Sequence, residues 1–229
     1  MPFIAIEGLD GSGKSSQIRL LREYLDVEGI SCHFISFPRD GASWHGQMVS
    51  RFLRGEFGQV DEIDPYFVAL LFAGDRKSAR IEMERALEAE ELLLTDRYVL
   101  SNLAFQCAKA PSKQDRDALR QWILDLEFGI NRLPRPDVSL YLDVPFEFVA
   151  QNLSDLRHGT DRDYLVGAQD IHEDSLDLQE NVAVEYEHLL SRFDTMIRID
   201  CHGSRGEPLP LQEVNQRILG TLREKRLIT

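Results

Sequence analysis

The chain has 229 residues, which suits one domain with a substantial core. Its net charge of -13 argues against a broad basic surface for nucleic acid. No apolar run reaches the roughly 18 residues of a membrane helix, and the first strand leaves no room for a secretion signal. Three widely spaced cysteines indicate reduced thiols, so we expect a cytoplasmic protein without membrane or nucleic-acid partners.

Strands and helices are predicted to alternate along the chain. Short apolar segments predict strands at 3–7, 31–37, 91–95, 137–143 and 196–200. Helical spacing of apolar residues predicts helices at 15–28, 44–55, 64–89, 112–130, 145–156, 172–191 and 211–225. This alternation is typical of a three-layer α/β fold, with a central parallel five-stranded sheet in a single domain, 1–229. Polar, poorly periodic residues from about 154 to 171 suit a mobile lid.

A glycine-rich motif follows the first predicted strand. Residues 8–15 fit the phosphate-loop pattern G-x-x-x-x-G-K-[ST] and precede a predicted helix. In that setting backbone N–H groups and the helix dipole converge on phosphate oxygens. Lys14 can reach the β- and γ-phosphates, and the Ser15 hydroxyl can ligate Mg²⁺. The predicted nucleotide-binding residues are Gly8, Leu9, Asp10, Gly11, Ser12, Gly13, Lys14, Ser15 and Ser16.

An acidic chain that binds a polyanion must gather its arginines locally, and Arg39 and Arg76 are two candidates. Arg39 follows Phe37-Pro38 at the end of the second strand, where it either faces an anion or lies solvated in a turn. Phe72 and Arg76 are four residues apart on one helix face. They form either a nucleobase reader, by stacking and hydrogen bonding, or a core phenylalanine beside an arginine that extends to water.

A third arginine stands after the strand at 91–95. Asp96 occupies the position of a Walker B aspartate, which holds Mg²⁺ directly or through water, and Arg97 can bridge transferring phosphates. The alternative is an Asp-Arg pair that caps the next helix. On that helix, polar and aromatic side chains recur at four-residue spacing and can meet a base and a sugar. They are Ser101, Asn102, Phe105 and Gln106.

Taken together, these motifs resemble thymidylate kinases. The resemblance rests on the loop at 8–16, Phe37-Pro38-Arg39, residues 71–76, 96–102, 135–137 and 140–144, and it runs from residue 3 to about 200. It implies a P-loop nucleoside-monophosphate-kinase-like fold that transfers the γ-phosphoryl group of ATP to dTMP with Mg²⁺. The product, dTDP, leads to dTTP. The resemblance also implies a homodimer.

The resemblance assigns roles at the acceptor site. It implies that Phe72 stacks on thymine and that Arg76 donates to the O4 carbonyl. It places Phe105 under the deoxyribose. Arg39 and Arg97 would clamp the acceptor phosphate. The other dTMP-binding residues it implies are Asp10, which would hold the 3′-hydroxyl unless it only stabilises the loop, together with Phe37, Ser101, Asn102 and Gln106.

The chemistry needs positioning and charge stabilisation more than covalent work. The catalytic residues implied are Lys14, Asp10, Arg97 and two arginines of the expected lid, Arg157 and Arg162. The lid arginines are invoked because residue 11 is glycine. A related nucleotide or deoxynucleoside kinase with another base preference remains an alternative. A deoxynucleoside kinase would need a general base and no clamp for an acceptor phosphate. A P-loop protein that only senses nucleotides is a further alternative.

Overall fold

The computed structural model describes residues 1–89, 91–154, 170–172 and 175–228. Five strands form one parallel sheet in the order β2-β3-β1-β4-β5. They are β1 (Phe3–Glu7), β2 (Cys32–Ser36), β3 (Leu92–Asp96), β4 (Val138–Asp143) and β5 (Met196–Asp200). The prediction of a parallel five-stranded sheet is confirmed. Ile6 of β1 is level with Asp96 of β3 and Leu140 of β4, so these strands end at one edge of the sheet.

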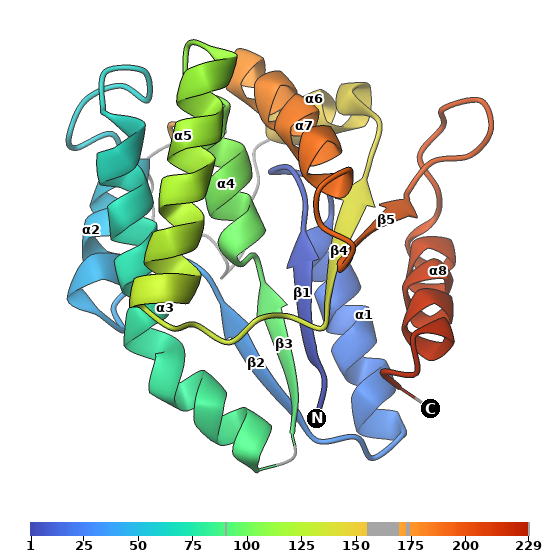
Figure 1. Cartoon of the computed structure of the whole chain (residues 1–229). Helices are drawn as coiled ribbons and strands as arrows, with labels where there is room; N and C mark the ends of the chain where they lie inside the picture. The colour runs from blue at the N-terminus through green and yellow to red at the C-terminus, as the bar shows by residue number, and fades with distance from the viewer. Residues whose placement is uncertain (90, 155–169, 173–174, 229) are drawn as a thin grey trace.

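Helices cover both faces of the sheet (Figure 1). One face carries α1 (Lys14–Val27) and α8 (Leu211–Glu224), and the other carries α3 (Pro65–Glu88), α4 (Val99–Cys107), α5 (Lys113–Leu124) and α7 (Leu176–Leu190). Successive residues of a strand point to opposite faces. Ile4 and Ile6 therefore pack with Leu21 of α1, whereas Phe3 packs with the cluster that contains Met83 of α3. This double burial explains why the central strands β1, β3 and β4 are mostly apolar.

Helix α2 (Trp44–Leu53) lies against α3 beside the main layers. Its first turn is capped by the Ser43 side chain, which accepts a hydrogen bond from Gly46 N at 2.8 Å. Phe52 and Leu53 of α2 pack with Val68 and Leu71 of α3. This smaller apolar cluster supports one wall of the cleft described below.

Three predicted elements differ from the structure or extend beyond its described part. The helix expected over 112–130 is α5 followed by a π-helical turn, η1 (Asp125–Ile130). The helix expected from 145 is α6 (Phe146–Ser154), and residues 155–169 of the expected lid lie outside the described residues.

The three cysteines are free thiols. Among the described residues, none of the helices combines the length and apolar character needed to cross a bilayer.

Candidate active site

The glycine-rich loop lies at the carboxyl edge of the sheet, between β1 and α1. Gly11 and Gly13 have φ values of 77° and 83°, a left-handed conformation that glycine adopts without strain. Helix α1 begins at Lys14, so the N–H groups of its first turn face the loop. Asn152 of α6 donates to Gly11 O at 2.8 Å and so links the loop to α6. The loop therefore has the backbone geometry of an anion cradle.

Lys14 is buried within this loop. Its Nζ donates to Leu9 O at 2.6 Å and to Gly8 O at 3.4 Å. Burial and the nearby Arg97 lower the pKa of Lys14 to about 8. A phosphate oxygen at this position would favour the charged form, since an opposite charge stabilises the ammonium.

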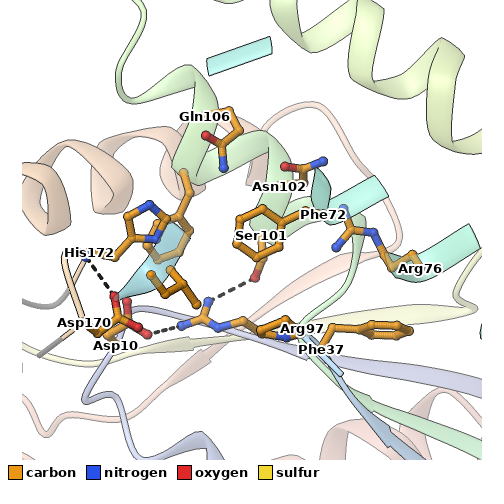
Figure 2. A pocket seen from close by; sticks show the side chains of 13 residues that line it. Asp10, Phe37, Phe72, Arg76, Arg97, Ser101, Asn102, Gln106, Asp170 and His172 are labelled. Carbon is orange, nitrogen blue, oxygen red and sulfur yellow. Dashed lines mark hydrogen bonds and ion pairs between the residues drawn. The ribbon is translucent and has the colours of Figure 1, made fainter. Parts of the chain in front are cut away.

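A cavity opens beside the loop (Figure 2). Its lining residues are Asp10, Phe37, Pro38, Leu53, Phe72, Arg76, Arg97, Ser101, Asn102, Phe105, Gln106, Asp170 and His172. Figure 2 shows Asp10 and Asp170 at one end and Phe72, Asn102 and Arg76 at the other. The structure thus brings together all the residues expected to contact dTMP except Arg39.

Arg97 is the main cation at the loop end of the cavity. It donates to Asp10 Oδ1 at 2.5 Å, to Gly8 O at 2.9 Å and to Ser101 Oγ at 3.1 Å. Its guanidinium also lies 5.0 Å from the centre of the Phe105 ring. The backbone φ of Arg97 is 61°, an uncommon value outside glycine that is often found at functional sites.

Asp10 is held by this cation and by α7. Gln179 of α7 donates to Asp10 Oδ2 at 2.8 Å and accepts from Asp10 N at 3.2 Å. Burial alone would raise the pKa of Asp10, but Arg97 and Lys14 outweigh it and hold that pKa well below its usual range. Asp10 is therefore an ionised acceptor at neutral pH, as a partner for a sugar hydroxyl should be.

A second carboxylate, Glu7, lies behind Arg97 and is fully buried. It accepts hydrogen bonds from Tyr98 N at 3.0 Å, from Tyr186 Oη at 3.2 Å and from Ser101 Oγ. Burial raises the pKa of Glu7, and Arg97 opposes that rise. The sequence analysis missed Glu7, although a charged residue at the end of an apolar strand was a usable signal.

At the other end of the cavity, Arg76 is only 2% exposed. Burial by itself would lower the pKa of Arg76, but ion pairing with Glu127 raises it. The alternative that Arg76 extends to water is wrong, because its guanidinium is buried and lines the cavity beside Phe72. Glu127 was not anticipated, since it lies 51 residues away on η1.

Two buried amide oxygens mark this end of the cavity. Asn102 Oδ1 and Gln106 Oε1 have no hydrogen-bond partner among the described residues. Both side chains line the cavity (Figure 2). Buried polar atoms are normally satisfied, so these atoms indicate a ligand that supplies N–H groups. The edge of a nucleobase is such a ligand.

The side wall of the cavity carries residues that the sequence analysis did not place there. His172 stacks on Phe105 with ring centres 5.1 Å apart, and it contacts Phe52 edge to face. Burial, followed by the charge on Lys109, lowers the pKa of His172 well below its usual value. His172 is therefore a neutral packing residue here. Asp170 Oδ1 accepts its backbone N–H at 2.8 Å.

Arg39 stands apart from the cavity. It donates to Ser78 Oγ at 2.6 Å and to Glu82 Oε2 at 2.8 Å, and it lies 3.7 Å from Asp75. Its assignment to the acceptor phosphate stays a prediction. Arg157 and Arg162, expected in the lid, lie outside the described residues.

Ser15 and Asp96, the two residues predicted to hold Mg²⁺, both carry oxygen donors. The Ser15 hydroxyl lies in the first turn of α1 and is exposed, and the half-buried Asp96 ends β3 beside β1. A hydroxyl and a carboxylate are hard oxygen donors, which suit Mg²⁺ better than a soft metal. The donor set therefore fits the ion.

A parallel sheet, a phosphate loop after its first strand and a cavity beside that loop define a P-loop kinase of the nucleoside-monophosphate kinase type. The family model "Thymidylate kinase" matches residues 6–205. The chain belongs to the thymidylate kinase family.

Individual relatives agree with this assignment. The chain is 31% identical to a thymidylate kinase of Mycobacterium tuberculosis over 190 residues, which cover 83% of this chain and 86% of the relative. It is 28% identical to a probable thymidylate kinase of Thermococcus gammatolerans over 231 residues, 98% and 97% of the two chains. A solved thymidylate kinase from Candida albicans has the same fold, with a TM-score of 0.73, 21% identity and coverage of 98% and 92%.

Proposed function

We propose that this chain binds ATP at the glycine-rich loop and dTMP in the adjoining cavity, and transfers the γ-phosphoryl group to the dTMP phosphate to give dTDP. Membership of the thymidylate kinase family supports this reaction. The observation that carries it is Arg97, which lies between loop residue Asp10 and the cavity residue Ser101. One guanidinium can thereby serve both nucleotides at the point of transfer.

At the phosphate end of the site, the positive charge of Arg97 is already in position before the substrates bind. Arg97 is oriented by Asp10 and by Gly8 O, so it needs little reorganisation to stabilise charge on the transferred group. Lys14 would exchange its contacts with the loop carbonyls for the β- and γ-phosphates. The Ser15 hydroxyl and Asp96 would hold Mg²⁺, which neutralises charge on the ATP phosphates. Arg39, Arg157 and Arg162 would add cations around the closed site.

At the base end, the geometry suits a pyrimidine with an O4 carbonyl. Phe72 would stack on the ring, and Arg76 would donate to O4. Asn102 Oδ1 would accept the N3–H, and Gln106 would contact the remaining edge. Phe105, held between Arg97 and His172, would support the deoxyribose.

A deoxynucleoside kinase would need a general base near a 5′-hydroxyl. Among the described residues, the carboxylates that line the cavity are Asp10 and Asp170. Asp10 belongs to the loop, is held by Arg97 and Gln179, and has a depressed pKa. Asp170 accepts the backbone N–H of His172. Glu7 does not line the cavity. The site therefore favours an acceptor that is already a phosphate dianion.

The test is a coupled ADP-release assay with dTMP, dUMP, dCMP, dGMP and thymidine as acceptors. We expect dTMP to give the highest kcat/KM. Lys14→Met should abolish turnover while the melting temperature stays near that of the wild type. Faster phosphorylation of thymidine than of dTMP would overturn the assignment, and turnover that no acceptor changes would favour a nucleotide sensor.

We also propose that the enzyme is a cytoplasmic homodimer. An apolar strip on α3, formed by Tyr66, Phe67 and Leu70, is between 38% and 49% exposed. Such a strip commonly marks a protein contact. Free thiols suit a reducing compartment. Light scattering should give twice the chain mass for the wild type and a single chain mass for Phe67→Glu.

A further inference from the structure

A buried carboxylate stands behind the base end of the cavity. Glu127 is 0% exposed and does not line the cavity. It lies on η1, a π-helical turn, and such turns often occur at functional sites. It contacts two side chains that do line the cavity, Arg76 and Asn102.

The contact with Arg76 leaves one nitrogen of the guanidinium for a ligand. Nε donates to both Glu127 oxygens at 3.0 and 3.1 Å, and Nη2 donates to Oε1. Within the described part of the chain, none of the hydrogen bonds engages Nη1 of Arg76. Because a guanidinium has hydrogen-bond donors and no acceptor, Arg76 presents a fixed donor to the cavity.

The contact with Asn102 fixes the orientation of its amide. Asn102 Nδ2 donates to Ala69 O at 3.1 Å and to Glu127 Oε1 at 2.9 Å. Both partners are acceptors only, so a flipped amide would place Oδ1 against two oxygens. Asn102 Oδ1 is therefore the atom left to meet a ligand, and the structure gives it no partner among the described residues. It is a fixed acceptor.

We propose that Glu127 is a positioning residue that sets the donor–acceptor polarity of the base site. The proposal rests on the function proposed above. By fixing Arg76 and Asn102, Glu127 makes the cavity select a base that presents a carbonyl oxygen next to a ring N–H. Thymine and uracil present that pair. Cytosine presents an amino group to the Arg76 donor and an unprotonated nitrogen to the Asn102 acceptor, and unpaired groups of this kind cause strong rejection.

A second buried ion pair, elsewhere in the chain, serves as a control that separates this positioning role from a purely structural one. Arg120 and Glu185 also form a buried ion pair, at 2.8 Å, and neither residue lines the cavity. Glu185→Gln should destabilise the fold without changing base preference. Glu127→Gln should change base preference as well. A glutamine supplies only one acceptor oxygen, and its NH₂ group favours a turned Asn102 amide.

The experiment measures kcat/KM for dTMP and for dCMP in the full-length wild type and in Glu127→Gln, Glu127→Asp and Glu185→Gln, with melting temperatures. For Glu127→Gln we expect the dTMP-to-dCMP ratio to fall at least about tenfold, mainly through a higher KM for dTMP. Glu127→Asp keeps the charge but withdraws it by one methylene. It should lower the ratio by at least about threefold. Glu185→Gln should leave the ratio within about twofold of the wild type.

An unchanged ratio in both Glu127 variants would overturn the proposal, as would an equal fall in Glu185→Gln. If Glu127→Gln does not fold, Glu127→Asp decides by the same criterion. The wild-type rates test the proposed function separately. A wild type that prefers dTMP, with Glu127 variants that keep its preference, would remove this inference and leave the kinase assignment intact.

Discussion

Replacing Arg97 by alanine tests the centre of the proposed mechanism. The substitution removes hydrogen bonds to Asp10, Gly8 and Ser101 and the contact with the Phe105 ring. Asp10 also loses the first of the two cations that lower its pKa. Both the acceptor clamp and the carboxylate expected to hold the sugar are therefore disturbed at once.

The expected fall in kcat/KM follows from the contacts of Arg97. Hydrogen bonds to charged groups contribute about 1.5–3 kcal/mol each. A single such bond made only in the transition state corresponds to about a tenfold to hundredfold effect on rate. An arginine that serves the transferring phosphoryl group contributes about a thousandfold or more. We therefore expect Arg97→Ala to lower kcat/KM for dTMP by at least about a hundredfold.

The assay compares steady-state ADP release in the wild type, Arg97→Ala, Arg97→Lys and Arg19→Ala. Lysine keeps the charge but not the fork that reaches three acceptors, so Arg97→Lys should remain well below the wild type. Arg19 is an exposed residue of α1 paired with Glu23, and Arg19→Ala controls for the loss of one positive charge. Rates like those of the wild type in a folded Arg97→Ala protein would remove Arg97 from the active site.

Three further predictions concern other parts of the site. Arg76→Ala should weaken the preference for dTMP over dCMP more than it slows transfer, and it should cost about 3–5 kcal/mol in urea unfolding because Glu127 is left buried and unpaired. An unchanged preference would contradict the base-reading role. Chelation of Mg²⁺ by EDTA should abolish turnover. Ser15→Ala should raise the Mg²⁺ concentration that gives the half-maximal rate, and an unchanged Mg²⁺ titration would exclude the Ser15 hydroxyl as a ligand. Burial lowers the pKa of Lys109 to about 7, so between that value and its unfolded value the unfolded chain binds more protons and stability rises with pH. The free energy of unfolding, measured with urea at pH 7 and at pH 9.5, should rise less with pH in Lys109→Met than in the wild type. An equal rise in the two proteins would refute the lowered pKa of Lys109.

Most of the fold was predictable because its signals are local. The five strands are short apolar runs, and the helices between them repeat apolar residues at helical spacing. The phosphate loop and the residues from Asp96 to Gln106 are contiguous motifs, so their side chains were found from the sequence. The helix expected over 112–130 does end at Ile130, but the π-helical form of its last six residues was not predictable, because the spacing of apolar residues does not distinguish such a turn from an α-helix.

The residues that support the site could not be predicted in the same way. Glu7 reaches Ser101 across 94 positions, and Gln179 reaches Asp10 across 169. Neither pair forms a motif, since each depends on which strands and helices become neighbours. His172 lies against Phe105 for the same reason. A single sequence indicates the residues that face the ligand better than those that orient them.

In a chain of net charge -13, these carboxylates orient the arginines of the cavity and do not add to their attraction for phosphate. Each key cation of the cavity has a buried or half-buried anion beside it, Asp10 for Arg97 and Glu127 for Arg76. A neutralised guanidinium attracts phosphate less strongly, but its fork is fixed in one orientation and needs no rearrangement during reaction. Selectivity then depends on where the remaining N–H groups point and not on total positive charge. That is why a change at Glu127, which touches no substrate, should alter which base is accepted.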